Sequence, residues 1–271
     1  MLRFLRSLFS SGDAGADDVD LPAIPSGERV YAVGDIHGRD DLFAALIAAI
    51  EHDDAEAPGA RTTVILLGDL VDRGPDSARV VRRARDWQAR RAVRILLGNH
   101  EEMFLKSFSS AETLRHFLRH GGRQTLVSYG IDPKAITASD VEQVQALMQR
   151  YVPQSVRDYL AGFEDMIRIG DYVFVHAGID PVVPLADQIT ADMRWIREPF
   201  LSHSGPYEAL VVHGHTISDA PEVRGNRIGV DTGAYASGRL TALVLEGGRR
   251  RFIEAVQHPD GQITAGPRAL V

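Results

Sequence analysis

The chain has 271 residues, of which 44% are hydrophobic and 25% charged, proportions typical of a globular protein with an ample core. Its formal net charge of -7 argues against stable binding to the polyanionic backbone of nucleic acids. The absence of cysteine excludes disulfides, thiolate metal sites and cysteine nucleophiles, and it fits a cytoplasmic protein.

The first 27 residues are predicted to form a flexible arm and linker in front of one domain, residues 28–271. Residues 1–9 alternate apolar side chains with two arginines, and residues 10–25 are rich in Gly, Asp, Ala and Pro. The arm lacks the apolar core and cleavage site of a secretory signal, and no stretch reaches the roughly 18 apolar residues of a membrane span. We expect the arm to fray or to dock on its own domain. An amphipathic contact with a membrane or a partner is the less favoured alternative.

Three strand–turn–helix units follow one another at intervals of about 30 residues. Buried strands are predicted for the apolar runs 29–33, 64–67 and 93–97. A helix capped by Asp40 or Asp41 is expected after the first strand, and a second helix near 77–90 follows the second strand. Units of this kind form parallel strands joined by right-handed crossovers.

Between residues 103 and 163 the apolar residues change to helical spacing, with interruptions at Gly121-Gly122, Gly130 and Asp132-Pro133. This pattern predicts a helical insertion of several short helices over the edge of the sheet. The insertion could act as a lid or specificity module, or it could simply cover core, and the two interpretations are compatible.

Strands return in the second half of the chain. A hairpin is expected around Gly170-Asp171. Further strands are predicted at 209–212, 227–230, 240–245 and 250–256.

Five predicted strands end in polar side chains that could converge, because the carboxyl ends of parallel strands meet at one edge of a sheet. The five groups are Asp35 and His37; Asp69, Asp72 and Arg73; Asn99 and His100; His176; and His213 with His215. Oxygen and imidazole donors without sulfur suit Mn²⁺, Fe, Zn²⁺ or Mg²⁺. A carboxylate with both oxygens free can bridge two cations about 3.5–4 Å apart, the spacing used in two-metal hydrolysis.

These motifs resemble the motif set of the phosphoprotein phosphatase family within the calcineurin-like metallophosphoesterases. The motifs are Gly34-Asp35-x-His37-Gly38, Gly68-Asp69-x-x-Asp72-Arg73-Gly74, Gly98-Asn99-His100-Glu101, His176-Ala177-Gly178 and Gly214-His215-Thr216. They occur in family order, and Asp231-Thr232-Gly233 extends the likeness. The resemblance implies an α/β fold, a two-sheet β-sandwich flanked by helices. Its first sheet would contain the strand–helix units, and its second the later, largely antiparallel strands.

The resemblance also implies a role for each motif residue. Asp35 and His37 would hold the first metal, Asp69 would bridge, and Asn99, His176 and His215 would hold the second. The cofactor would be two divalent ions, with Mn²⁺ the first choice and Fe, Zn or Mg the alternatives. His100 would protonate the leaving oxygen, with Asp72 on its other nitrogen. Arg73, Asn99 and a second arginine would bind phosphate; Arg197 is favoured for that position and Arg194 competes with it.

Several neighbouring residues have weaker interpretations. His213 lies on the same strand face as His215 and could sit in the site or behind it. Asp231 is expected to anchor its turn, and Tyr235 and His203 lie in loops that could overhang the cleft. Glu101 and Arg39 are expected to orient their neighbours.

The predicted activity is hydrolysis of a phosphoester by direct attack of a metal-bound hydroxide. The favoured substrate is phosphoserine or phosphothreonine in proteins. A dinucleoside polyphosphate such as diadenosine tetraphosphate is the alternative, because Gly214-His215-Thr216 stands where larger eukaryotic protein phosphatases have Arg-Ala-His. A non-catalytic metal-binding module is disfavoured because the motif set is complete, and a nuclease because the chain is acidic.

Overall fold

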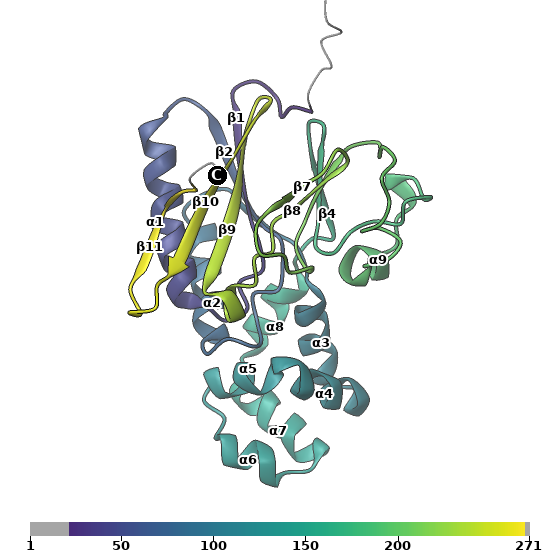
Figure 1. Cartoon of the computed structure of the whole chain (residues 1–271). Coiled ribbons are helices and arrows are strands. Elements are labelled where there is room, and N and C mark those ends of the chain that lie inside the picture. Colours follow the sequence, from purple (N-terminus) through teal and green to yellow (C-terminus); the bar gives the residue numbers. More distant parts are fainter. Residues whose placement is uncertain (1–21, 269–271) are drawn as a thin grey trace, which may run out of the picture.

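A computed structural model describes residues 22–268 of the chain (Figure 1). Most of the predicted N-terminal arm, residues 1–21, lies outside the described residues. In the described part, no helix combines the length and the apolar character needed to cross a membrane.

The first sheet has six strands in the order β11-β10-β9-β1-β2-β3. Their bounds are β1 Glu28–Val33, β2 Arg61–Leu66, β3 Val93–Ile95, β9 Arg239–Glu246, β10 Arg249–Gln257 and β11 Ile263–Pro267. β1 runs parallel to β2, with Tyr31 opposite Val64, and β2 runs parallel to β3. The predicted parallel strands of the first three units are therefore confirmed.

The second sheet has five strands in the order β4-β5-β6-β8-β7. Their bounds are β4 Met166–Ile169, β5 Tyr172–Val175, β6 Leu210–His213, β7 Glu222–Val223 and β8 Arg227–Gly229. The predicted hairpin joins β4 to β5 in antiparallel pairing. β5, β6 and β8 are parallel to one another, so the expectation of a largely antiparallel second sheet is wrong.

The placement of β9 and β10 also differs from the expectation, because both belong to the first sheet. β9 pairs antiparallel with the free edge of β1. Ala242 and Val244 face the helix-covered side, whereas Leu243 and Leu245 face the core between the sheets. A strand that is apolar on both faces needs a cover on each side, and the position beside β1 provides both covers.

Two apolar layers hold the sandwich together. The core between the sheets contains Val30, Ala32, Ile65 and Leu67 of the first sheet and Tyr172, Phe174, Val212 and Ile228 of the second. The outer face of the first sheet is covered by α1 (Asp40–Glu56) and α2 (Ser77–Gln88). Neither Asp40 nor Asp41 caps α1, because the helix already begins at Asp40. Asp40 instead accepts a hydrogen bond from Arg83 Nε at 2.6 Å.

The helical spacing predicted for residues 103–163 is confirmed by a group of helices at one end of the sheets (Figure 1). Their bounds are α3 Asn99–Ser107, α4 Ala111–Phe117, an irregular turn Leu118–Gly122, α5 Arg123–Ser128, α6 Pro133–Ala138, α7 Val141–Tyr151 and α8 Gln154–Ala161. They form their own core around Phe104, Phe117, Leu126 and Met148. α9 (Thr190–Trp195), α10 (Ala234–Ser237) and a short turn, Leu185–Asp187, complete the described elements.

Candidate metal centre

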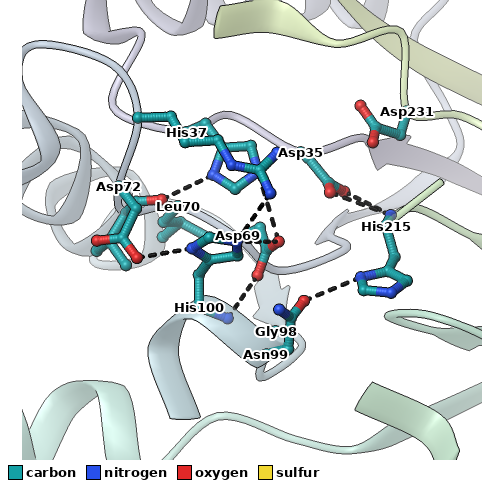
Figure 2. A network of polar contacts seen from close by, with 12 residues as sticks. Asp35, His37, Asp69, Leu70, Asp72, Gly98, Asn99, His100, His215 and Asp231 are labelled. Atoms are coloured by element: carbon teal, nitrogen blue, oxygen red, sulfur yellow. Dashed lines mark hydrogen bonds and ion pairs between the residues drawn. The ribbon is translucent and has the colours of Figure 1, made fainter. Parts of the chain in front are cut away.

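The candidate site lies at the carboxyl ends of β1, β2, β3, β5 and β6, and Figure 2 shows its central residues. The turns after β1 and β2 are joined by backbone hydrogen bonds: His37 N–H donates to Asp69 O at 2.8 Å, and Gly74 N–H donates to His37 O at 3.0 Å. These bonds hold the backbone of the two turns in fixed positions relative to each other, and with it the candidate ligands that the turns carry.

The backbone is strained at this place. Among residues 22–268, the non-glycine residues with a left-handed φ are His37, Asp69, Asp72, Arg73 and His215, with φ between 44° and 74°. The sequence had selected all five as candidate site residues. Such conformations persist only where surrounding contacts hold them, and they gather at functional sites.

Within the described part of the chain, two groups of titratable side chains could hold a metal ion. One contains His37, Asp69 and His100, and the other contains Asp69, His176 and His215; in each group the ligand atoms lie within 4.8 Å of one another. Asp69 is common to both. Its Oδ2 lies 3.5 Å from His37 Nε2, and its Oδ1 lies 3.5 Å from His176 Nε2.

The two buried histidines present their free nitrogens to Asp69. His37 Nδ1 lies 2.8 Å from Val71 O, and His176 Nδ1 lies 2.8 Å from Leu67 O. A carbonyl can only accept, so each Nδ1 carries the proton and each Nε2 keeps its lone pair. Burial lowers the pKa of His37 to about 3 and also lowers that of His176. Neutral imidazoles with fixed tautomers are the form that binds cations.

Asn99, His215 and Asp35 complete the centre. Asn99 Oδ1 lies 2.9 Å from both His176 Nε2 and His215 Nδ1. Asp35 belongs to neither group above; both of its oxygens accept the His215 N–H at 3.1 Å, and it lies between His37 and His215 in Figure 2. A Cβ on Gly214 would lie 2.1 Å from Asp35 Oδ1, which explains the glycine.

The protein shifts the pKa values of the two site carboxylates, Asp35 and Asp69, in opposite directions. Burial raises the pKa of Asp35, and the neighbouring Asp231 and Asp69 raise it further. Burial alone would raise the pKa of Asp69 too, but the surrounding histidines outweigh it and lower that pKa well below its usual range. Crowded buried carboxylates of this kind are what bound cations neutralise, so the donor set fits two divalent metal ions.

His100 has a different environment from the other site histidines. Its Nδ1 lies 2.6 Å from Asp72 Oδ2, and its Nε2 lies 3.1 Å from Arg73 Nη2. Burial opposes the charged form, but Asp69 and the hydrogen bond to Asp72 outweigh burial and raise the pKa of His100. The site therefore holds one histidine that favours the proton beside others that do not.

Sequence reasoning predicted His100 as a partner of Asp72 but missed the others. Thr125 Oγ1, in α5, donates to Asp72 Oδ1 at 2.6 Å and accepts the Asp72 N–H at 2.8 Å; Ser77 Oγ also accepts that N–H at 3.0 Å. Gly121 adds a contact, because its carbonyl accepts the Arg73 N–H at 3.1 Å. At φ 106°, a Cβ on Gly121 would lie 2.6 Å from Arg73 N. The Gly121-Gly122 pair was the only signal in the sequence, and it indicated no more than a helix break.

The two arginines that compete for the second phosphate-binding position, Arg194 and Arg197, have different partners. Arg194 is paired with Asp165 at 2.7 Å and with Glu102 of α3 at 3.4 Å. Arg197 reaches the site, with its Nη2 3.3 Å from His215 O and its Nη1 3.2 Å from Thr216 Oγ1. The geometry therefore favours Arg197 as the second phosphate-binding candidate.

Of the remaining candidates, Tyr235 lies over the site, whereas His203 and His213 have contacts elsewhere. Tyr235 overhangs the site: its ring centroid is 4.7 Å from the Arg73 guanidinium and 5.4 Å from the His37 ring. His203 instead packs against Tyr207. His213 is buried against Phe200, with its Nδ1 3.0 Å from Gly214 O, and belongs to neither candidate metal group.

Two other expectations about neighbours are met by hydrogen bonds. Asp231 accepts the Gly233 N–H at 2.8 Å, the expected turn anchor. Arg39 donates to Asp41, to Gln257 and to Ala234 O, next to Tyr235.

Glu101 is fully buried and fixes the turn that carries Asp69. Its Oε2 accepts the N–H groups of Gly98 and Asp69 at 3.0 and 2.9 Å. Its Oε1 accepts those of Leu70 and Val71 at 2.7 and 3.1 Å. Burial and the nearby Asp69 raise the pKa of Glu101 to about 8, whereas the four backbone N–H groups, two on each oxygen, favour the charged carboxylate.

Glu101→Gln is therefore expected to lower the free energy of unfolding of the metal-free protein by about 2–4 kcal/mol. The new NH₂ group would face backbone donors and leave them unsatisfied. Urea unfolding measures the change. Exposed Glu142→Gln on α7 is the matched control and is expected to stay within about 0.5 kcal/mol. Equal small losses in both variants would contradict this structural role.

The fold and site together define a metallophosphoesterase. A family profile described as calcineurin-like phosphoesterase matches residues 28–235. The chain belongs to this family. The family uses a dinuclear metal centre, which agrees with the pair of candidate groups that share Asp69.

The chain is similar to two kinds of bis(5′-nucleosyl)-tetraphosphatase. A symmetrical one from Acidovorax sp. (strain JS42) is 34% identical over 182 residues, 67% of this chain and 51% of the relative. An asymmetrical one from Bacillus velezensis (strain DSM 23117 / BGSC 10A6 / LMG 26770 / FZB42) is 28% identical over 233 residues, 77% of this chain and 86% of the relative. The match thus spans about half the length of the first relative.

A solved structure supports the fold. The crystal structure of a candidate diadenosine tetraphosphatase superposes with a TM-score of 0.56 at 22% identity, covering 93% of this chain and all of the other. The resemblance to the metallophosphoesterases is therefore confirmed. The names of these relatives agree with the alternative substrate of the sequence analysis, the dinucleoside polyphosphate, better than with the phosphoprotein first favoured.

Proposed function

We propose that this chain hydrolyses dinucleoside polyphosphates at a centre of two divalent cations, with Mn²⁺ the first choice. The observation that carries the two-metal centre is the position of Asp69, whose two oxygens face different imidazoles; the names of the relatives support the dinucleotide as the substrate class. In this proposal Asp35, His37 and Asp69 hold one cation, and Asp69, Asn99, His176 and His215 hold the other. When bound, the cations lower the pKa of a coordinated water and neutralise phosphate charge.

The other site residues would bind the phosphate and supply the proton for the leaving group. Arg73 offers a planar guanidinium for phosphate beside the Tyr235 ring. Its Nη2 can only donate, so when His100 carries a proton on Nε2 this donor turns from the ring to the phosphate. Arg197, which contacts His215 O from the turn after α9, and Asn99, at the start of α3, would donate to the phosphate as well. His100 donates a proton from Nε2 to the leaving oxygen, while Asp72 holds Nδ1 and favours the charged ring.

The substrate class is tested by initial rates on diadenosine tetraphosphate, a phosphothreonine peptide and para-nitrophenyl phosphate, after metal removal and reloading with Mn²⁺. We expect kcat/KM to be highest on the dinucleotide, by 10-fold or more, because only that substrate offers two nucleosides as well as a polyphosphate for binding energy. A higher value on the peptide would return the phosphoprotein to first place.

The products locate the cleaved bond. Two molecules of adenosine diphosphate indicate symmetrical cleavage, whereas adenosine triphosphate plus monophosphate indicate asymmetrical cleavage. Chromatography of one reaction mixture separates the two outcomes. If the Mn²⁺-loaded protein hydrolyses none of the three substrates, the proposed function is wrong.

A further inference from the structure

A pocket of about 410 Å³ lies between the helical insertion and α9. Its walls are Glu102, Met103 and Lys106 of α3, Glu112, Thr113 and His116 of α4 with Arg119 of the turn that follows, and Ala191 and Trp195 of α9. The volume falls within the range of small-molecule sites. Its lining side chains are distinct from the candidate metal ligands and from Arg73 and Arg197.

An indole ring forms the apolar surface of this pocket. Trp195 keeps 40% of its surface exposed, which is unusual for so large an apolar side chain. Its Nε1 donates to Glu102 Oε2 at 2.5 Å. Glu102 is in turn held by Lys106 at 2.6 Å and Arg194 at 3.4 Å. The ring is therefore exposed and yet fixed in orientation, as a preorganised stacking surface requires.

Three walls of the pocket are connected through a few residues of the chain to the phosphate side of the candidate metal centre. Along α3, Met103 follows His100 by three residues, a rise of about 5 Å. Arg197 follows Trp195 by two residues and contacts His215 O. On the third wall, Arg119 precedes Gly121 by two residues, and the Gly121 carbonyl accepts the Arg73 N–H.

We propose that this pocket binds one nucleoside of the substrate, with its base stacked on Trp195. The polar groups of the pocket suit a nucleoside: Glu112 and Thr113 can accept from or donate to a base or ribose. Arg119 supplies positive charge beside a polyphosphate that leads to the metal centre, whereas the charge of Lys106 is paired with Glu102. This inference rests on the proposed function and adds to it the residue that reads the nucleoside.

Fluorescence tests binding without catalysis. The chain has two tryptophans, and the other, Trp87, is 1% exposed in the core, so quenching by an added ligand reports on Trp195. We expect adenosine diphosphate to quench the metal-loaded protein saturably and pyrophosphate not to do so. The quenching should disappear in Trp195→Phe, which retains Trp87. Equal quenching by both ligands, or none, would overturn the proposal.

Kinetics provides the second test. Base–aromatic stacking contributes about 1–3 kcal/mol, so Trp195→Ala is expected to raise KM for diadenosine tetraphosphate about 5- to 150-fold. Hydrolysis of para-nitrophenyl phosphate should stay within about 2-fold, because that substrate has no nucleoside. Trp195→Phe should recover most of the affinity, since it restores an aromatic face.

The matched control is Tyr151→Ala on α7, which removes an aromatic ring of 38% exposure that does not line the pocket. It should leave KM unchanged. If wild type hydrolyses the dinucleotide and Trp195→Ala does so with unchanged KM, the pocket is not the nucleoside site although the proposed function stands. If wild type does not hydrolyse dinucleotides, the proposed function fails, and the fluorescence result alone decides whether the pocket binds a nucleoside.

Discussion

Replacing His100 with asparagine is expected to lower kcat on diadenosine tetraphosphate by about 100-fold, the lower end of the range for loss of a general acid. The physical reason is the leaving group. A nucleoside polyphosphate leaves as a weak base, with a phosphate pKa of about 6, so it gains less from protonation than an alkoxide does. On a phosphothreonine peptide, the same substitution should cost up to about 10⁴-fold.

Metal content distinguishes the acid role from a ligand role. His100 Nε2 lies 4.0 Å from Asp69 Oδ2, and His100 belongs to one of the two candidate metal groups. If His100 acts as the acid, His100→Asn keeps both metal ions by elemental analysis and loses turnover. A drop to one metal per chain would instead make it a ligand. Asp72→Asn, which keeps the shape but weakens the hold on His100 Nδ1, should lower kcat with metal content unchanged.

Asp69→Asn should remove metal binding at both positions together. Losing a hydrogen-bond partner of a metal ligand usually lowers metal affinity about 10- to 100-fold. A shared ligand should cost more, so we expect a loss of more than about 100-fold at each position. Calorimetric titration of the metal-free protein with Mn²⁺ measures it. Exposed Asp158→Asn on α8 is the matched control and should bind as wild type does. Retention of one tight site in Asp69→Asn would contradict the shared role.

Thermal unfolding tests whether Asp69 is a metal ligand without measuring activity. A ligand present at 100 times its Kd stabilises the folded state by about 2.7 kcal/mol. Chelation with EDTA should therefore lower the Tm of Mn²⁺-loaded wild type and leave the Tm of Asp69→Asn unchanged. An equal response in both proteins would show that the stabilising metal lies elsewhere.

The sequence determined the types of chemical group and their places at strand ends. Apolar runs followed by Gly-Asp or Gly-Asn marked β1, β2 and β3. A strand that is buried on both faces carries apolar side chains, so polar side chains return only in the turn that follows it. This local alternation was enough to select Asp35, His37, Asp69, Asn99 and His100. Helical spacing likewise marked the insertion, since periodicity is a property of neighbouring residues.

Only the tertiary structure decided which segments meet. β9 could have joined either sheet, and its place beside β1 follows from apolar residues on both faces that needed a cover on each side. Thr125 lies 53 residues from Asp72, and no local pattern predicts that hydrogen bond. The pocket under Trp195 arises where α9 meets α3 and α4. Contacts between distant segments depend on how whole elements pack, and a linear pattern carries no record of that packing.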